Sequence, residues 1–249
     1  MHIRENKESK AIKQFSRFAH TYDTYNIIQT EVARELVDRL SLQSYNTILD
    51  IGCGSGAIYK NIIKKQIEFK SFIALDSAEE MLAIHPKEEK IYKYCADFNL
   101  LETYKGIEVL SKESLLLSSS ALQWSQNLDF SFRQLSQKAA KAYFAIFTSK
   151  TFKTLHSTGK IKSPIYSISE LKENIEKHYV ASFELKEYRL EFKTVKDMFK
   201  YIKKSGVSGG KKQLTYKQTK QLIKSYPLKY LEFEVLFVEA TSLVNSSEA

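Results

Sequence analysis

A glycine-rich turn between an apolar segment and a helical one constrains this chain more than any other feature. Residues 47–51 (Thr-Ile-Leu-Asp-Ile) have the composition of a buried strand, and Gly52, Gly54 and Gly56 follow before a helical stretch near 56–67. Glycine at such a position permits a tight turn, close packing of helix on strand, and a close approach of the backbone to a ligand. The turn therefore predicts a strand–loop–helix unit that binds a ligand at its loop.

The same alternation of apolar runs and helical stretches continues to residue 149. Further strands are predicted near 72–76, 92–96, 115–120 and 142–147. Helices are predicted through Met81 and Leu82, with Ser77 as N-cap, and over residues 128–138. Near-continuous apolar strands separated by helices are typical of a mostly parallel sheet covered on both faces. We therefore expect an α/β fold with a doubly wound, Rossmann-like sheet.

Both ends of the chain depart from this alternation. Residues 1–43 contain apolar positions at three- and four-residue steps, which predict an N-terminal helical lid. Residues 150–180 contain two short helical patterns, which indicate an inserted cap. The alternating segment 183–192 and the apolar segment 231–240 predict an antiparallel closing pair of strands. We expect all 249 residues to form a single domain.

Composition excludes several classes of protein. Hydrophobic residues make up 43% of the chain and charged residues 27%, close to the averages for soluble globular proteins. No run approaches the roughly 18 consecutive apolar residues of a membrane span. The first residues lack the apolar core of a secretory signal, and two cysteines cannot form a disulfide framework. These features predict a cytoplasmic protein that has no membrane partner.

Positive charge is concentrated in one segment. The net charge is +9, and residues 193–229 contain eleven lysines against a single acid, Asp197. Such a local field raises the association rate of an acidic partner. However, 32 of the 38 cationic residues are lysine, so the segment could equally be a solvated face of a lysine-rich chain. Both interpretations stay open at this point.

Three acids follow the predicted strands near the glycine loop. Asp50 lies two residues before Gly52, where a nicotinamide-binding loop normally has an apolar residue. An acid there suits a cationic amino group, which S-adenosylmethionine has and NAD lacks. Asp76 is placed for a ribose diol, and Asp97 is placed to accept from an adenine amino group with Phe98 against the ring. Together these residues predict an S-adenosylmethionine site, although each acid could also cap a turn or a helix.

Several motifs outside the loop resemble one family of class I methyltransferases. Residues 15–23 (Phe-Ser-Arg-Phe-Ala-His-Thr-Tyr-Asp), followed by Gln29, are similar to the N-terminal signature of malonyl-acyl-carrier-protein O-methyltransferases of biotin synthesis. Residues 118–124 (Ser-Ser-Ser-Ala-Leu-Gln-Trp) and 202–207 (Ile-Lys-Lys-Ser-Gly-Val) are similar to two further motifs of this family. The similarity covers nearly the whole chain. It departs at Ser163-Pro164-Ile165, where relatives carry a basic residue.

The resemblance implies methyl transfer from S-adenosylmethionine to the free carboxylate of malonyl-acyl carrier protein. A malonyl carboxylate is already ionised at neutral pH, since aliphatic carboxyl pKa values lie near about 4. No general base is therefore required, and Tyr22, Gln123 and Trp124 are expected to position the acceptor in a neutral pocket. Trp124 could instead be a packing anchor. No metal site is expected, because no cluster of His, Cys and Asp has ligand spacing.

Lysines are the candidates for holding the acidic protein partner. Lys150 and Lys162 are expected to orient the malonyl carboxylate, and Lys200, Lys203 and Lys204 to bind the carrier protein. Two other functions remain possible from the sequence. The first is an RNA methyltransferase in which the basic segment 193–229 follows the phosphates, although nucleic acid is not the expected partner. The second is a non-catalytic or NAD-binding Rossmann domain, because Gly52, Gly54 and Ala57 also fit the dinucleotide pattern.

Overall fold

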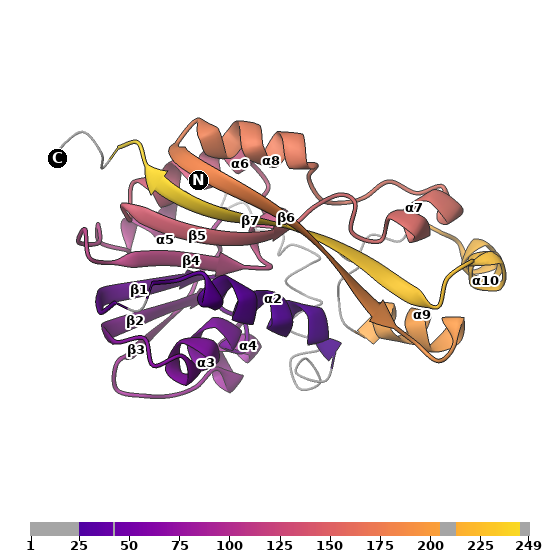
Figure 1. The fold of residues 1–249 in the computed structure, drawn as a ribbon, viewed down its shortest axis with the longest axis horizontal. Coiled ribbons are helices and arrows are strands. Elements are labelled where there is room, and N and C mark those ends of the chain that lie inside the picture. The colour runs from indigo at the N-terminus through magenta and orange to yellow at the C-terminus, as the bar shows by residue number, and fades with distance from the viewer. Residues whose placement is uncertain (1–24, 42, 205–212, 245–249) are drawn as a thin grey trace, which may run out of the picture.

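A computed structural model describes residues 25–41, 43–204 and 213–244, apart from the side chains of residues 203 and 204. Within these residues one seven-stranded sheet carries helices on both faces (Figure 1). The strands are β1 (Tyr45–Ile51), β2 (Phe69–Asp76), β3 (Ile91–Cys95), β4 (Leu115–Ser119), β5 (Lys141–Phe147), β6 (Tyr179–Glu191) and β7 (Tyr230–Ser242). The helices are α2 (Ile27–Asp38), α3 (Ala57–Lys64), α4 (Glu79–Ile84), α5 (Leu101–Lys105), α6 (Leu128–Ser136), α7 (Lys153–Gly159), α8 (Ile168–Glu176), α9 (Val195–Lys204) and α10 (Tyr216–Ser225), with a 3₁₀ turn, η1 (Leu122–Trp124).

The strand order is β3-β2-β1-β4-β5-β7-β6. Strands β1 to β5 are parallel, and β7 pairs antiparallel with both β5 and β6. The predicted Rossmann-like sheet and its antiparallel closing pair are therefore confirmed. The chain reverses its direction of winding between β1 and β4, and open α/β sheets bind ligands in the crevice at such a reversal.

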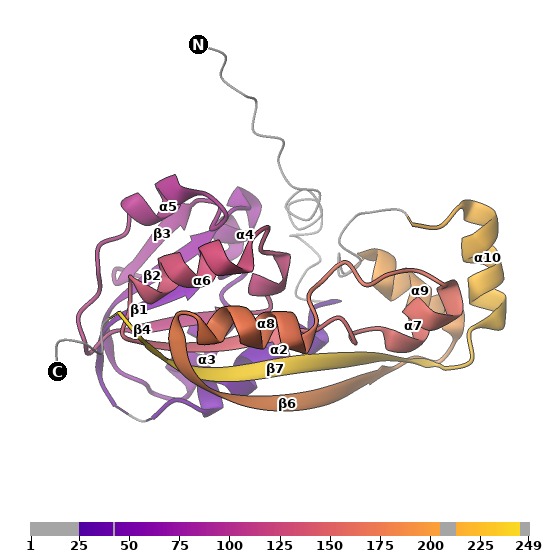
Figure 2. The ribbon, with the colours of Figure 1, turned by 90° about the horizontal axis from the view of Figure 1, so that it is seen from above.

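Helices cover the two faces of the sheet because its strands are apolar on both sides. On β1, Ile48 belongs to the core beneath α2 and α3, whereas Leu49 and Ile51 belong to the core beneath α5, α6 and α8. All three side chains are completely buried. Figure 2 shows these helix layers on opposite sides of the strands. This double burial holds the carboxyl ends of the parallel strands at one edge.

The described part of the predicted lid is α2, which packs directly on the sheet. Val32 and Leu36 of α2 are fully buried in the core. Glu35 accepts hydrogen bonds at 2.7 and 2.8 Å from Lys186 Nζ on β6, and a further one from Tyr188. These contacts hold α2 across the sheet. The predicted N-cap Ser77 is wrong, because α4 begins at Glu79 after Ala78 and has no side-chain cap.

Strands β6 and β7 have 13 residues each and extend beyond β5 (Figure 2). Helices α7, α9 and α10 gather around the far end of this hairpin, where α10 contacts both α7 and α9. Helix α8 instead packs on α6 and β6. The segment 150–180 predicted as one cap therefore contributes one helix to the far group and one to the sheet. The single-domain boundary over the whole chain stays a prediction.

Candidate active site

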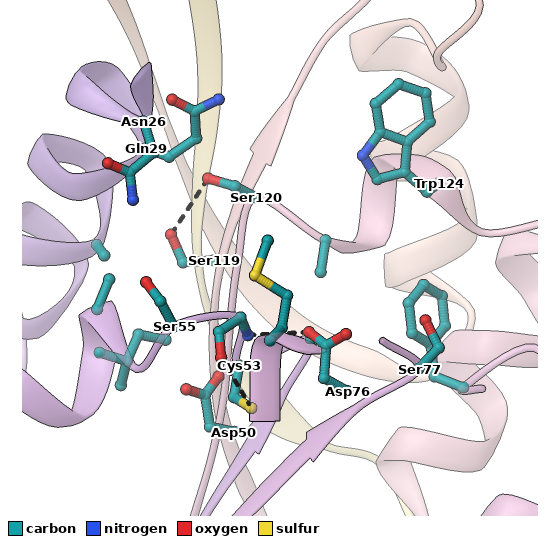
Figure 3. Close-up of a pocket in the computed structure, with 18 of the residues that line it drawn as sticks. Asn26, Gln29, Asp50, Cys53, Ser55, Asp76, Ser77, Ser119, Ser120 and Trp124 are labelled. Carbon is teal, nitrogen blue, oxygen red and sulfur yellow. Dashed lines mark hydrogen bonds between the residues drawn. The ribbon is translucent and has the colours of Figure 1, made fainter. Parts of the chain in front are cut away.

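A cavity opens at the carboxyl edge of β1, β2 and β4, beside the glycine loop (Figure 3). Its empty space is about 900 Å³ when the part open to solvent is included. Its wall is formed by four groups of residues and by Ala33, Ala57, Ile58, Ser77 and Met81. The groups are the start of α2 (the preceding Asn26, and Gln29), the ends of the first three strands (Asp50, Asp76, Asp97, Phe98, Asn99), the loop (Gly52, Cys53, Gly54, Ser55), and the end of β4 with the segment that follows (Ser119, Ser120, Ala121, Trp124). The structure thus brings together the three acids, two of the three glycines and the tryptophan that the sequence singled out. Gly56 lies outside this wall, at the N-terminus of α3.

Two glycines of the loop are required for different reasons. Gly52 has φ +71°, and a Cβ atom built on it would lie 2.3 Å from Cβ of Ala121. Gly54 has φ +52°, and a Cβ atom there would meet nothing within 4 Å. Gly52 therefore allows the loop to pack against the segment after β4, whereas Gly54 leaves open space on the cavity side.

Asp50 is fully buried at the base of the cavity. Within the described residues neither of its carboxylate oxygens has a hydrogen-bond partner. Burial, and secondly the nearby Asp76 carboxylate, raise the pKa of Asp50 well above its usual range. A buried carboxylate without a partner is costly, and a cationic ligand group would offset that cost.

Asp76 is in a different environment from Asp50. Its Oδ2 accepts a hydrogen bond at 2.9 Å from the Gly54 amide, and its Oδ1 accepts one at 2.9 Å from the Ala78 amide. Burial raises the pKa of Asp76, and these backbone hydrogen bonds act in the opposite direction. Asp76 therefore supports the loop, and each of its oxygens keeps a lone pair for a ligand hydroxyl.

Asp97 and Phe98 both lie in the cavity wall. Asp97 Oδ1 accepts from both the backbone amide and the side-chain amide of Asn99, at 2.9 and 2.8 Å. Asn99 in turn accepts at 2.8 Å from the Gln126 amide. This chain of hydrogen bonds fixes the carboxylate. The contacts of Asp97 and Phe98 with an adenine ring stay predictions.

Of the two neighbouring residues Gln123 and Trp124, only Trp124 reaches the cavity wall. The Gln123 side chain is buried behind the wall, and its Nε2 donates to the Ser120 carbonyl at 2.6 Å. Ser120 has φ +60°, a conformation that is strained for a residue with a side chain. The expected contact of Gln123 with the acceptor is therefore corrected, because Gln123 supports Ser120 from behind.

Sequence reasoning missed several polar residues of the cavity wall. Asn26 immediately precedes α2 and Gln29 lies on it, while Ser119 ends β4 and Ser120 follows it (Figure 3). Gln29 belongs to the N-terminal motif and the two serines to the motif of residues 118–124, so the motifs held a signal for them. Tyr22, the third predicted positioning residue, lies outside the described residues.

Lys150 and Lys162 do not line the cavity. Lys150 lies 3.7 Å from the buried carboxylate of Glu234, and the Lys162 backbone bonds to the Gln213 side chain. Lys200 is exposed on α9, 3.4 Å from Asp197. The side chains of Lys203 and Lys204 fall outside the described part of the chain. The structure thus does not bring Lys150 or Lys162 to the site, which corrects their expected role in orienting a carboxylate.

The described ranges hold no group of three His, Cys, Asp or Glu side chains placed to bind a metal ion. Over the same ranges, every helix is too short or too polar to cross a membrane. Among the cavity-lining residues that the structure describes there are three aspartates and no lysine, arginine or histidine. The cavity can therefore bind a cationic ligand without a competing positive charge from its wall.

Solved structures with the same fold include the YcgJ protein of Bacillus subtilis, with a TM-score of 0.62 at 10% identity over 85% of this chain and 98% of that one. Phosphoethanolamine N-methyltransferase 2 of Haemonchus contortus, solved with S-adenosyl-L-methionine, gives a TM-score of 0.51 at 13% identity over 84% of this chain and 52% of that one. At such identities the likeness establishes the fold alone.

No family model matches the chain. Similarity to proteins of named function comes from curated relatives. A malonyl-[acyl-carrier protein] O-methyltransferase of Priestia megaterium is 31% identical over 231 residues, which is 81% of this chain and 82% of the relative. An enzyme of the same name from Bacillus cytotoxicus is 26% identical over 86% of this chain and 80% of its own length. The resemblance seen in the motifs is thereby confirmed: this chain belongs to the malonyl-[acyl-carrier protein] O-methyltransferase family.

Proposed function

We propose that the protein transfers a methyl group from S-adenosylmethionine to the free carboxylate of a malonyl group on acyl carrier protein. The observation that carries this proposal is the charge of the cavity wall. Asp50 is buried there with no hydrogen-bond partner in the described residues, and none of the described lining residues is cationic. S-adenosylmethionine brings an ammonium group and a sulfonium group, and both are cations. The names of the relatives supply the acceptor.

The residues of the cavity fit this cofactor. Asp50 would accept from its amino group, and the backbone at Gly52 and Gly54 would approach it closely. Asp76 would accept from the ribose hydroxyls, and Asp97 would accept from the adenine amino group beside the Phe98 ring. NAD has no cationic amino group that could pair with Asp50. The cavity wall therefore favours S-adenosylmethionine over NAD.

When bound, S-adenosylmethionine supplies a methyl group that a carboxylate oxygen takes from sulfur, with the C–S electron pair remaining on sulfur and no proton transferred. The protein's contribution is then to exclude water and to hold the acceptor in line. Such positioning can supply roughly 7–11 kcal/mol. Trp124 and the loop around Ser119 and Ser120 enclose the side of the cavity where the acceptor would enter.

We further propose that the carrier protein docks on α9 and α10. Exposed lysines occupy both helices, namely Lys196, Lys200, Lys217, Lys220 and Lys224. An acidic protein would be steered toward such a surface, over a distance that salt limits to about 8 Å. This arrangement separates a basic docking surface from the acidic cofactor cavity.

Turnover with radiolabelled S-adenosylmethionine tests the proposal against its rivals. The protein is incubated in parallel with malonyl-acyl carrier protein, malonyl-coenzyme A and bulk RNA. We expect label in an alkali-labile ester on the malonyl carrier and none in RNA. Label in RNA alone would overturn the proposal in favour of an RNA methyltransferase. Calorimetric binding of NAD without binding of S-adenosylmethionine would identify a dinucleotide-binding domain instead.

A further inference from the structure

We infer that Gln29 and Trp124 form a subsite that holds the acceptor carboxylate through uncharged N–H donors. This inference rests on the proposed function and adds the chemistry by which the acceptor is recognised. Gln29 is only 9% exposed, and its Oε1 is buried with no partner in the described residues. The indole Nε1 of Trp124 is likewise buried and unpartnered within that part of the chain. Both residues line the cavity.

The two side chains face the cavity from opposite sides. Figure 3 shows Gln29 on the α2 side and Trp124 across from it, with the indole nitrogen turned inward and Ser120 between them. Asp50 lies at the other end of the cavity in the same view. One cavity therefore has two ends. A ligand group that pairs with Asp50 would lie at one end, and a ligand group that contacts Gln29 and Trp124 would lie at the other.

Buried polar atoms without a hydrogen-bond partner usually have a reason in folded proteins. The described residues contain eleven such side-chain atoms, and four of them belong to the cavity wall, namely both oxygens of Asp50, Oε1 of Gln29 and Nε1 of Trp124. Their gathering in one wall indicates a ligand. Indole Nε1 can only donate a hydrogen bond. The Gln29 amide has a donor end and an acceptor end, which exchange by a half-turn about its last torsion. The unpartnered Gln29 atom as placed is the acceptor Oε1, and the half-turn puts the donor Nε2 in its position. In that orientation Gln29 and Trp124 both donate, and a ligand that satisfies both must present two acceptor lone pairs, as a carboxylate does.

Neutral donors suit a carboxylate that acts as a methyl acceptor. The charges of sulfonium and carboxylate cancel as the new C–O bond forms and the C–S bond breaks. A lysine or arginine bound to the carboxylate would therefore stabilise the reactants more than the transition state. N–H groups without formal charge orient the carboxylate and leave it nucleophilic, which agrees with a wall in which the described residues include no cation.

Contacts behind the wall hold both donors in place. Helix α2, which carries Gln29, is fastened to β6 through Glu35 and Lys186. The turn that carries Trp124 is held by Tyr166, whose hydroxyl donates to the Ser125 carbonyl at 2.8 Å. The subsite is thus built on anchored elements, so a carboxylate would bind without first ordering them.

A carboxylate could reach this subsite from two sources, the acceptor or the amino-acid portion of the cofactor. We assign the acceptor, because Asp50 accounts for the amino-acid end at the opposite side of the cavity (Figure 3). The variants that separate the sources are Gln29→Met and Trp124→Phe, which remove the donors and keep the bulk. Gln137→Met is the matched control, since Gln137 is exposed at the end of α6.

Two affinities are measured by calorimetry for each full-length protein. One is for S-adenosylhomocysteine, and the other is for the malonyl thioester of N-acetylcysteamine in the presence of saturating S-adenosylhomocysteine. We expect both site variants to bind the malonyl thioester about tenfold or more weakly, the loss typical of a hydrogen bond to a charged group. Their affinity for S-adenosylhomocysteine should match that of the control and wild type.

Fluorescence gives an independent readout, because Trp124 is the single tryptophan of the chain. The malonyl thioester should change the emission of the wild type and of Gln137→Met, and its methyl ester should leave the emission unchanged. In Gln29→Met the change should require a higher concentration of the thioester. Equal responses to the acid and its methyl ester would overturn the assignment of a carboxylate.

The remaining outcomes are distinct. Weaker binding of S-adenosylhomocysteine with unchanged thioester binding would assign the pair to the cofactor carboxylate and overturn the inference. Unchanged binding of both ligands would also overturn the inference. Selective loss of thioester binding in the variants, together with no methylation of malonyl-acyl carrier protein by the wild type, would support the subsite and overturn the proposed function.

Discussion

The cavity at the carboxyl edge of the sheet and the helices at the far end of the β6–β7 hairpin differ in the sign and the burial of their charges. The cavity wall contains Asp50, Asp76 and Asp97 and, in its described residues, no cation. Helices α9 and α10 expose Lys196, Lys200, Lys217, Lys220 and Lys224 to solvent. Buried charges interact strongly with a ligand, whereas exposed charges are screened by water and salt. Substitutions in the cavity should therefore change affinities and stability, and substitutions on the helices should change mainly the encounter with a partner.

The two regions also differ in how their charged groups are fixed. Asp76 is held by two backbone amides, so its position is coupled to that of the loop. Lys200 lies near the exposed Asp197, and Lys220 lies 5.2 Å from the Tyr216 ring centre on an exposed face. Exposed pairs of this kind contribute about 0–1 kcal/mol. The lysines can thus be reversed with little effect on folding, which makes the comparison testable.

The largest effect is expected for Gly52→Val. Its Cβ would overlap Cβ of Ala121 at 2.3 Å on a backbone with φ +71°, so the loop must move. We expect a loss of about 3 kcal/mol or more in the free energy of unfolding in urea, and no measurable cofactor binding. Gly54→Ala is the control, because it has a positive φ and open space. It should cost only about 1–2 kcal/mol. Equal losses for the two variants would show that the contact with Ala121 does not limit the loop.

Asp50→Asn should change affinity and stability in opposite directions. Removing the carboxylate should weaken S-adenosylmethionine binding by about 1.5–3 kcal/mol, as for a lost hydrogen bond to a charged group. The free protein should become more stable at neutral pH, since its buried, unpaired carboxylate is gone. Calorimetry and urea unfolding measure the two quantities. If cofactor affinity and stability both decline, the Asp50 carboxylate has a structural partner, and the cavity does not select for a cation through Asp50.

The pH dependence of stability gives a second test of Asp50. Burial raises the pKa of Asp50 in the folded protein, so the folded state keeps its proton to a higher pH than the unfolded chain. The stability of the wild type without cofactor should therefore fall as pH rises from about 4, the unfolded value, through the raised pKa. An amide side chain cannot titrate, so this decline should be smaller in Asp50→Asn. Parallel curves for the two proteins would contradict the raised pKa.

Asp76→Ala should have an intermediate effect. We expect S-adenosylmethionine binding to weaken by about 1–3 kcal/mol, because a charge-assisted hydrogen bond to the ribose is lost. Stability should fall as well, since the amides of Gly54 and Ala78 lose their acceptor. Asp38→Ala, at an exposed acid of α2, serves as the control for the loss of a negative charge. A folded Asp76→Ala protein with normal cofactor affinity would show that the crevice binds its ligand elsewhere.

The smallest effect is expected for the double variant Lys196→Glu and Lys200→Glu on α9. The KM for malonyl-acyl carrier protein should rise about three- to tenfold at low salt, and the KM for S-adenosylmethionine should stay unchanged. The difference from the wild type should shrink as salt increases, because screening removes the steering. Charge reversal at Lys64 and Lys105, exposed on helices over the sheet, is the matched control. An equal rise in KM in the control would mean that net charge matters and that α9 is not the docking site.

Much of the fold follows from local sequence patterns. The apolar runs ending at Ile51, Asp76 and Cys95 are short, separated by helical stretches, and become parallel strands. Because carboxyl ends of parallel strands lie at one edge, the three acids could be placed in one cavity before the structure was known. The closing antiparallel pair was also predictable, since the alternation of residues 183–192 indicated a strand with an exposed face.

Other features depend on contacts between distant parts of the chain. Gln29 lines the cavity because α2 packs across the sheet. Lys150 forms an ion pair with Glu234 because β7, which carries Glu234, pairs with β5. Helices α7 and α8 take different positions because one meets α10 and the other meets α6. None of these partners lies within a helical turn of the residue concerned, so periodicity could not reveal them.

Local sequence patterns specify which residues end each parallel strand, and hence that acids and glycines meet at one edge of the sheet. The role of each side chain at that edge depends on the packing of distant elements. Within the described residues Asp50 has no hydrogen-bond partner, whereas two backbone amides hold Asp76. Trp124 lines the cavity, and the neighbouring Gln123 bonds to the Ser120 carbonyl. The physical reason is that strand and helix periods are local properties of the backbone. Hydrogen-bond satisfaction of a buried side chain depends instead on every element that packs around it.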